Sequence, residues 1–410
     1  MKQTKQLSPW QFTAFRVLFG AYLFVHFAQL LPWANELFGS GGVLADARLN
    51  PLHGLFPNPL VWIQWPQFPV IFVGGLMLCS LAFAAGFARR SAALVLWFGW
   101  ACLFNRNNLI ANPGIPYVGL LLVLSALVPL GEPWSFCRRT SVEPWFMPAF
   151  IYWCPWVLLA AGYTYSGGWK LFSPSWVDGT ALLHLMENPL ARPGPVRDLL
   201  LQLPLPFLKA LTWLALAGEI LFLPLCLTRR VRLVAWLWMI TMHLGILLVV
   251  DFTDLTLGML MVHLFTFDPD WMPPRQSKVL VLFDGQCAMC HRWVQFIEAE
   301  TASSAFTFAR LGGETARALL PRHQLAADFN EGVVFIEQFE GNERVFTKSS
   351  AVLRILDALG GFWRVVSWLR FVPVSVRDPI YDCVARHRLR WFGNQNACSL
   401  ALASRIRVLP

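Results

Sequence analysis

The amino-terminal two thirds of the chain is a succession of long apolar segments separated by short polar stretches. An apolar run of about 20 residues is what a helix needs to cross the hydrocarbon core of a bilayer. We therefore predict eight membrane-spanning helices, over residues 12–31, 68–88, 91–105, 115–130, 146–165, 205–227, 231–250 and 253–267. The first follows a basic amino terminus that lacks a small-residue cleavage motif, so we expect it to be retained rather than removed as a signal peptide.

The pattern changes near residue 275. Residues 1–275 carry 17 Lys and Arg and 12 Asp and Glu, whereas residues 276–410 carry 16 and 12 in half the length. The whole chain is 56% hydrophobic and only 14% charged. We therefore expect a multi-pass α-helical membrane bundle of about eight spans, residues 1–272, followed by a small α/β domain, residues 273–410.

Basic residues orient the predicted spans. With the amino terminus in the cytoplasm, the inner segments hold Lys2, Lys5, Arg89, Arg90, Arg138, Arg139, Arg229, Arg230 and Arg232. The outer segments hold Arg48, Arg106, Lys170, Arg192 and Arg197. Every basic doublet is then inside, as the positive-inside rule favours. We expect an integral protein of a bacterial inner membrane with both termini cytoplasmic.

The formal net charge of +9 does not indicate nucleic-acid binding, because it is spread over loops in the first part and is ordinary in the second. We expect no nucleic-acid partner; the lipid bilayer is the expected partner of the apolar part. The arginine-rich segment 385–393 is expected to be a solvated helix face, with contact to phosphate or anionic lipid as the alternative.

Four ionisable residues lie inside predicted spans, namely His26, Glu219, His243 and His263. Such groups are costly in lipid and usually face the interior of a bundle, which makes each a functional candidate. The alternative is a packing hydrogen bond to a neighbouring helix. Glu219 and His243, on sequential helices, are candidates for a pair that handles a proton.

The longest predicted outer segment, residues 166–194, is neither a tight turn nor a span. It carries the candidates Lys170, Trp176, Asp178 and His184. A long structured loop is often functional. The alternative is an amphipathic helix at the membrane interface that only caps the bundle.

The stretches "SGGWKLFSPSWVDGTALL", "LLVLSALVPLGEPWSF" and "MHLGILLVVDFTDLTLGMLMVHLFTFDPDW" resemble the HTTM family, the membrane domain related to vitamin K-dependent gamma-carboxylase. The resemblance covers about residues 10–272 and implies that Lys170 is a base acting on a reduced quinone. One extra residue separates Lys170 from Trp176, and the asparagine-rich stretch "FNRNNLIANPGIPY" lacks the expected histidine. The resemblance therefore implies the fold and a quinone as cofactor rather than carboxylation.

The second part opens with "VLVLF", a continuous apolar run typical of a strand buried on both faces. The motif C-x-x-C follows, and residues 291–300 have helical periodicity. Unpaired N–H groups and the positive dipole end of such a helix favour the thiolate of the first cysteine. We therefore predict Cys287 as an exposed nucleophile and Cys290 as the resolving thiol, with no cofactor required. His291 is expected either to hold the thiolate or to face solvent.

Structural zinc is the main competing explanation of a C-x-x-C motif, and it needs two further ligands at compatible spacing. No second C-x-x-C follows, and His323, Cys383, His387 and Cys398 are scattered. We therefore favour redox chemistry and expect no metal. Two strands and a helix after the first βα unit, within residues 332–360, complete a minimal thioredoxin-like core, although Gly332 stands where thioredoxins have a proline.

The segments "LFDGQCAMC", "TKSSAVLRIL", "VPVSVRDPIYDCVARHRLRWFG" and "ACSL" resemble the thiol-disulfide oxidoreductase DCC family over residues 279–401. The resemblance carries over Asp284, Cys287, Cys290 and Cys398 as motif residues. It also carries over the segment formed by Arg388, Arg390, Trp391, Phe392 and Gly393. Asp284 is expected to position the loop or accept a thiol proton, with a plain turn as the alternative; Cys398 is a third redox thiol or simply buried.

Two functions follow. The first is a membrane-anchored protein-disulfide oxidoreductase, supplied by a cytosolic thiol reductant and coupled to quinone-like chemistry in the membrane domain. The alternative is a maturation or export factor for a secreted peptide, in which the dithiol domain acts on the client's cysteines or serves for docking. Topology separates them, because a dithiol on the outer face fits client chemistry and a cytoplasmic one fits reductive supply.

Overall fold

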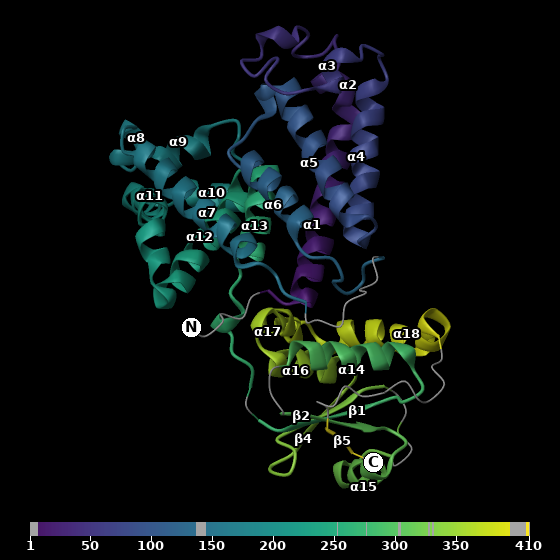
Figure 1. Cartoon of the computed structure of the whole chain (residues 1–410). Helices are drawn as coiled ribbons and strands as arrows, with labels where there is room; N and C mark the ends of the chain where they lie inside the picture. Colours follow the sequence, from purple (N-terminus) through teal and green to yellow (C-terminus); the bar gives the residue numbers. More distant parts are fainter. Residues whose placement is uncertain are drawn as a thin grey trace. The chain divides into compact units, whose positions relative to one another are not determined.

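The computed structural model describes residues 7–136, 145–251, 253–275, 277–301, 305–326, 329, 332–393 and 407–409 of the 410-residue chain. The chain divides into two compact units, Gln6–Phe267 and Asp268–Pro410. The described part of the first unit is built from helices, and the second is a small α/β domain (Figure 1).

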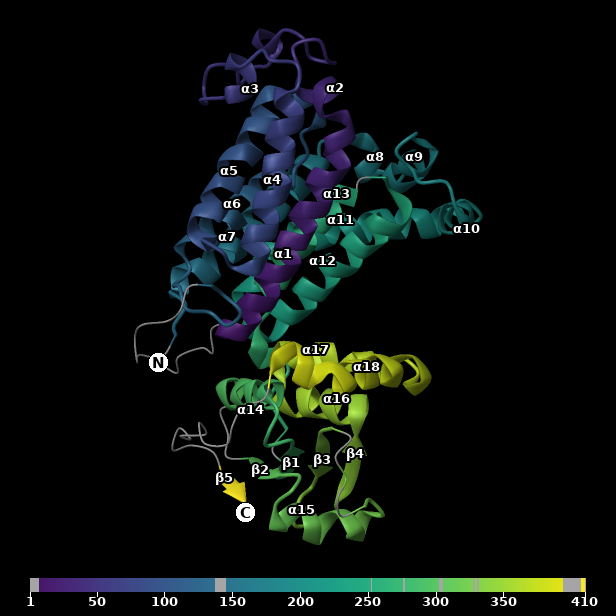
Figure 2. The same ribbon diagram turned by 90° about the vertical axis from the view of Figure 1, so that its right-hand side faces the viewer.

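Each of the eight apolar segments predicted from the sequence contains a helix. They are α1 (Pro9–Leu30), α4 (Phe68–Ala85), α5 (Arg89–Arg106), α6 (Ile115–Leu127), α7 (Ala149–Lys170), α11 (Leu205–Leu227), α12 (Arg229–Val249) and α13 (Thr253–Phe265). In the bundle α1 packs on α4 and α13, α5 packs on α4 and α6, and α7 packs on α11 (Figures 1 and 2). The mostly helical character of this unit is confirmed.

Not all of these helices have the dimensions of a membrane span. Four in the described part of the chain are long and apolar enough to cross a bilayer, namely Pro9–Phe38, Phe68–Ala85, Leu205–Leu227 and Arg229–Val249. Two further apolar helices are shorter, Ile115–Leu127 and Asp254–Phe265. At 1.5 Å per residue, α6 and α13 rise only about 20 Å, less than the ~30 Å hydrocarbon core. The prediction of eight spans is thus supported for four helices by length and composition.

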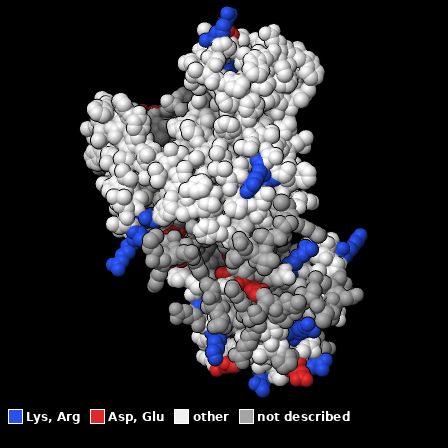
Figure 3. Space-filling view, viewed as in Figure 1, with Lys and Arg blue, Asp and Glu red and all other residues white. Residues whose placement is uncertain are grey.

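Short elements connect the long helices. Before α4 and after α5 they are η1 (Leu31–Trp33), α2 (Ala34–Phe38), η2 (Ala47–Leu49), α3 (Pro59–Trp62) and η3 (Asn108–Ile110). The predicted outer segment 166–194 contains the end of α7, then α8 (Pro174–Val177) and α9 (Ala181–Glu187), and α10 (Pro195–Leu201) follows it. In the view of Figure 3 the surface of this unit is almost entirely uncharged, whereas charged side chains of both signs lie over the carboxyl-terminal domain.

The carboxyl-terminal domain is built on a five-stranded sheet in the order β4-β3-β1-β2-β5. The central strand β1 pairs parallel with β2 and antiparallel with β3, which pairs antiparallel with β4. All five residues of β1 are buried, as predicted from its unbroken apolar run. The strands are β1 (Val279–Phe283), β2 (Phe306–Arg310), β3 (Val334–Glu337), β4 (Arg344–Thr347) and β5 (Arg407–Leu409).

Helices cover both faces of this sheet (Figures 1 and 2). One face carries α14 (Ala288–Glu300), α16 (Lys348–Leu359), α17 (Gly361–Val366) and α18 (Val374–Phe392). The other carries α15 (Glu314–Leu319), whose Ala316 and Leu319 form a core cluster with Leu280 and Leu282 of β1. The remaining elements are η4 (Pro269–Trp271), η5 (Leu320–His323) and η6 (Ser367–Phe371).

Candidate functional site

The two cysteines of the C-x-x-C motif lie where the central strand passes into a helix. β1 ends at Phe283, and Cys287 is the N-cap residue of α14, with extended backbone at φ −91° and ψ 119°. The first backbone N–H groups of α14 have no intrahelical partner and lie near this residue. Together with the helix dipole they favour negative charge at this place. The strand-to-helix setting predicted for the motif is therefore present.

Cys287 is fully buried, with 0% of its surface exposed, whereas Cys290 is partly exposed. The expectation of an exposed Cys287 is therefore wrong. Gly393, which follows α18, lies beside the first turn of α14, because the Ala288 N–H donates to its carbonyl at 3.4 Å. A client disulfide needs a local opening at this point to reach the Cys287 sulfur.

Cys290 lies one turn after Cys287 on α14, close enough for the two thiols to interact electrostatically. Burial, followed by the nearby Cys287, raises the pKa of the Cys290 thiol well above its ordinary value. Asp284 acts in the same direction, and the Arg388 guanidinium opposes both. A thiol with a raised pKa keeps its proton at neutral pH, which suits a resolving cysteine better than an attacking one.

Asp284 joins the loop before α14 to α18. One of its carboxylate oxygens accepts from the Gln286 N–H at 2.9 Å and shapes the turn. The other accepts from Arg388 Nη2 at 3.0 Å, with both side chains 13% exposed. The Arg388 charge acts on both cysteine sulfurs. Asp284 thus forms the turn and also holds a cation beside the dithiol, a role for Arg388 that the sequence motif did not reveal.

His291 is buried, and the expectation that it faces solvent is not met. Its Nδ1 lies 3.1 Å from the carbonyl oxygen of Cys287, one turn earlier on α14. Its ring meets the edge of Phe283, with centroids 5.8 Å apart. The histidine therefore fixes the first turn of α14 through the backbone of Cys287.

A tyrosine that sequence reasoning missed lies beside the dithiol. The Tyr381 hydroxyl on α18 accepts from the Val333 N–H at 3.0 Å. Burial raises the pKa of the Tyr381 phenol, and the nearby Cys290 adds to the shift. Tyr381 and Arg388 are seven positions apart on one helix, so they lie on the same face. The available signal was that spacing within the stretch "VPVSVRDPIYDCVARHRLRWFG".

Cys398 lies outside the described residues. The other candidates for a zinc site have separate surroundings: His323 pairs with Glu343 at 2.8 Å, and the His387 ring stacks on Trp391 with centroids 5.0 Å apart. Cys383 is exposed. Across the described part of the chain, no three His, Cys, Asp or Glu side chains come together in a way that could hold a metal ion.

The helical unit brings several of its predicted polar residues together. Lys170, at the end of α7, lies with its Nζ 2.5 Å from Glu219 Oε1 on α11. The same ammonium lies 4.4 Å from the centre of the Trp176 ring, a cation–π distance. Gly167 allows this approach, since a Cβ there would lie 2.9 Å from the Ile220 backbone nitrogen. The ion-pair partner of Glu219 is thus Lys170, where the sequence suggested His243 as its partner.

The two histidines of the last helices share a tyrosine. The Tyr163 hydroxyl lies 2.7 Å from His243 Nε2 and 2.9 Å from His263 Nε2, and all three side chains are buried. A hydroxyl has one proton, so between two neutral rings it donates to one Nε2 and accepts from the other, and the rings carry opposite tautomers. Tyr163 was missed, although it stands seven positions before Lys170 on the same face of α7.

This cluster of Tyr163, Lys170, Glu219, His243 and His263 is incompletely satisfied. The Nδ1 atoms of both histidines and Oε2 of Glu219 are buried without a hydrogen-bond partner among the described residues. Each such atom costs about 1–3 kcal/mol. Buried polar atoms of this kind call for water or a ligand.

The other predicted residues of this unit have different surroundings. His26 on α1 is buried against the Trp100 ring, with centroids 4.9 Å apart. Asp178 accepts from the N–H and hydroxyl of Thr180 at 2.8 and 2.6 Å and shapes the turn before α9. His184 is exposed, 4.0 Å from Glu187.

Comparison with known proteins agrees with the geometry of the dithiol loop. Residues 281–394 match the family model described as DCC1-like thiol-disulfide oxidoreductase. The chain is 37% identical over 132 residues to the uncharacterised protein YuxK of Bacillus subtilis, a match covering 32% of this chain and 93% of that protein. It is 33% identical over 138 residues to a chloroplastic DCC family protein of Arabidopsis thaliana, covering 32% of this chain and 78% of that protein.

The helix-capping cysteine, its partner one turn on and the sheet behind them place the carboxyl-terminal domain in the class of thiol-disulfide oxidoreductase-like proteins. The chain belongs to the DCC1-like thiol-disulfide oxidoreductase family. The HTTM resemblance of the helical unit finds no support in these comparisons. No solved structure shows significant similarity to the chain.

Proposed function

We propose that the carboxyl-terminal domain is an enzyme of thiol–disulfide exchange, with Cys287 attacking and Cys290 resolving. The observation that carries the proposal is Cys287 at the N-cap of α14 with Cys290 one turn further on the same helix. The sheet order, in which a β-α-β unit precedes a β-β-α unit, supports a thioredoxin-like core.

The exchange proceeds in two balanced steps. The Cys287 thiolate attacks one sulfur of a client disulfide, forms a mixed disulfide and releases the other client sulfur as a thiolate, which takes up a proton. Cys290 then gives up its proton and attacks the Cys287 sulfur, which frees the second client thiol and leaves a Cys287–Cys290 disulfide. Two electrons pass to the client, and a thiol reductant restores the dithiol.

Trapping of the mixed disulfide tests this assignment. Full-length Cys290→Ala protein, in a Cys383→Ala background that removes an exposed thiol on α18, is incubated with a peptide disulfide. We expect one peptide half to remain bound at Cys287, detected by mass spectrometry, whereas the Cys287→Ala control captures none. Equal capture by both variants would contradict the assignment of Cys287 as the attacking cysteine.

We propose further that the helical unit anchors this activity in a membrane, with up to eight crossings and both termini cytoplasmic. Four helices with the length and composition of spans support the anchoring. In Figure 3 the largely uncharged surface of the unit, in contrast to the charged carboxyl-terminal domain, supports it as well. Helices that enter only partway can pack against longer neighbours, as α6 does against α5.

A second proposal couples the dithiol to quinone chemistry at the cluster around Lys170. Its support is the Lys170–Glu219 pair and the unsatisfied buried nitrogens of His243 and His263. Formation of the Cys287–Cys290 disulfide releases two electrons and two protons, the number that converts a quinone to a hydroquinone. Lys170, whose ammonium pairs with Glu219, would donate a proton to a quinone oxygen in this reduction and, as the neutral amine, would act as the base toward the hydroquinone hydroxyl in the reverse direction.

Duroquinone tests the coupling, because its ring is fully substituted and cannot add a thiol. Purified full-length protein with a reduced dithiol should produce duroquinol, and Cys287→Ser should not. Lys170→Met should lose this reaction while keeping peptide exchange. Absence of quinone binding, or an unchanged quinone in the presence of reduced protein, would reject the coupling and leave thiol exchange standing.

A further inference from the structure

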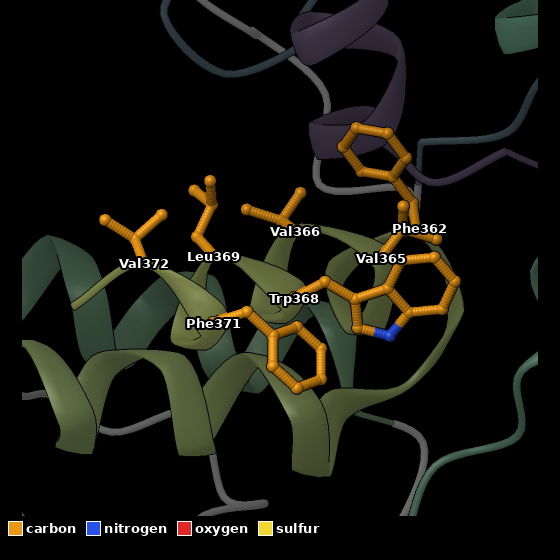
Figure 4. A pocket seen from close by; sticks show the side chains of 7 residues that line it. All are labelled: Phe362, Val365, Val366, Trp368, Leu369, Phe371 and Val372. Carbon is orange, nitrogen blue, oxygen red and sulfur yellow. The ribbon is translucent and has the colours of Figure 1, made fainter.

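An apolar face covers the outer side of α17 and η6 in the carboxyl-terminal domain. Figure 4 shows its side chains side by side around a shallow hollow, among them Phe362, Val366, Trp368, Leu369, Phe371 and Val372. We call these residues the α17–η6 face. Phe371 is 77% exposed, and Leu369 is 56% exposed.

The face is held in place from behind. Trp363 points to the opposite side of α17, where its indole N–H donates to Glu300 at 2.7 Å and its ring meets Phe296 edge-on with centroids 4.8 Å apart. Ser367, between the two elements, is fully buried and donates to the Arg364 carbonyl at 2.7 Å. The apolar side chains are therefore presented outward by a fixed backbone, and a contiguous exposed apolar patch usually marks an interaction site.

Arginine side chains lie in the same two elements as the α17–η6 face. Arg364 and Arg370, within α17 and η6, lie 3.2 and 3.5 Å from the single buried carboxylate of Asp357. Arg275 lies 2.7 Å from the same group and also pairs with Glu337 at 3.4 Å, so three arginines lie beside two carboxylates. Residues 361–392 contain six arginines and two aspartates. Aromatic and aliphatic side chains beside excess arginine are the composition of a surface that binds anionic lipid.

The covalent connection keeps this face near the end of an apolar helix. Met272 follows Phe265, the last residue of α13, by seven positions, and its carbonyl accepts from the Gly361 N–H at 2.5 Å. Seven residues of chain extend at most about 25 Å. If α13 ends at a membrane surface, the first residue of α17 lies within that distance of it.

We infer that the α17–η6 face docks on an anionic phospholipid bilayer, with Trp368, Leu369 and Phe371 at the level of the headgroups and Arg364 and Arg370 toward the lipid phosphates. The inference rests on the proposed insertion of the helical unit. Docking fixes the distance between the dithiol domain and the membrane, for which the length of the linker sets only an upper limit.

Photo-crosslinking of the full-length protein in nanodiscs of equal phosphatidylcholine and phosphatidylglycerol tests the docking. A p-benzoylphenylalanine replaces Phe371, Leu78 or Arg317 in separate variants. Leu78 is exposed on α4 and reports insertion of the helical unit, whereas Arg317 is exposed on α15, on the other face of the sheet. After illumination, mass spectrometry identifies what each position has captured.

We expect phospholipid adducts at 371 and 78, at least tenfold more than at 317, and a reduced yield at 371 in phosphatidylcholine alone. Adducts at 78 with none at 371 would overturn the docking and leave membrane insertion intact. Capture by 371 of the same chain's helical unit, or of a second copy, would overturn it as well and assign the face to that partner. Absence of lipid at 78 would reject the insertion itself.

Discussion

At the scale of single residues, a positive charge, a negative charge and burial act on the two sulfurs of the dithiol site. Arg388 brings a positive charge that acts on both, while Asp284 holds that cation and contributes a negative charge of its own. Burial dominates at Cys290 and keeps it protonated. The two thiols of one motif therefore differ in readiness to react because their surroundings differ.

The pH dependence of Cys290 follows from its raised pKa. In a Cys287→Ser variant, burial still opposes the Cys290 thiolate, so alkylation by iodoacetamide should keep accelerating through pH 9, where an ordinary thiol of pKa about 8.5 is already levelling off. Quantitative mass spectrometry of the Cys290 peptide at successive pH values measures this. A plateau below pH 8.5 would show that burial does not control this thiol.

Removal of the Arg388 charge should slow the attacking cysteine. Arg388→Gln leaves Asp284 as an uncompensated anion near the dithiol, and we expect Cys287 alkylation at pH 7 to fall about tenfold, which corresponds to about 1.4 kcal/mol. Arg388→Lys should recover part of the rate. Arg390→Gln, an exposed neighbour on α18, is the matched control and should stay within about twofold; equal rates in Arg388→Gln and wild type would deny the electrostatic role.

At the scale of elements, α18 organises the dithiol domain. It supplies Arg388 to the loop before α14, Tyr381 to the residue before β3, and Asp382 to Lys348 at the start of α16, at 3.1 Å. Gly393, which follows it, accepts from the first turn of α14. One helix late in the sequence thus contacts the loop before α14, the first turn of α14, the segment before β3 and the start of α16.

Gly332 sets how closely α18 approaches β3. Its φ of +135° disfavours any other residue, and a Cβ would lie 2.0 Å from the Tyr381 hydroxyl. Gly332→Ala should therefore destabilise the domain by about 2–4 kcal/mol. Pulse proteolysis of the full-length protein in urea, followed through a carboxyl-terminal tag, measures the change. Gly312→Ala, where a Cβ meets nothing within 4 Å, should behave like wild type; equal loss in both variants would refute the packing argument.

One of the basic doublets that orient the predicted spans is partly buried. Arg89, the first residue of an inner basic doublet, is buried with its Nε 2.7 Å from Glu132, and Arg16 pairs with the same carboxylate at 2.7 Å. A buried, paired arginine serves packing, so only Arg90 of that doublet remains as an orientation signal. The other inner doublets, at 138–139 and 229–230, still favour a cytoplasmic face.

At the scale of the whole molecule, the side of the membrane on which the dithiol domain lies distinguishes the two functions. A cytoplasmic domain fits a dithiol that a cytosolic reductant supplies, and an outer one fits a maturation or export factor. Cys383 on α18 is exposed, whereas Cys287 is buried, so Cys383 is the better reporter. An impermeant maleimide should label it only after cells are permeabilised, and Cys383→Ser should lose that label. Labelling in intact cells would place the dithiol domain outside and favour the maturation or export factor.

Much of the organisation was determined by the sequence alone. Each of the eight apolar segments contains a helix, and composition distinguishes the apolar first part of the chain from the second part, which has the composition of a soluble domain. Both features depend only on local periodicity and residue type. The C-x-x-C motif at the start of a helix was likewise predictable, since a buried strand, a turn and an amphipathic helix follow one another within residues 279–300. These features need no knowledge of distant contacts.

The tertiary structure decided which distant residues meet. Tyr163 joins two histidines about 80 and 100 positions away, while His26 packs elsewhere, and nothing in the period of their helices distinguishes these outcomes. Cys287 is buried, and the first turn of α14 is hydrogen-bonded to Gly393, about a hundred residues later. Helix lengths, the positions at which helices cross and their packing determine such contacts. These are properties of the tertiary structure and cannot be read from any single segment.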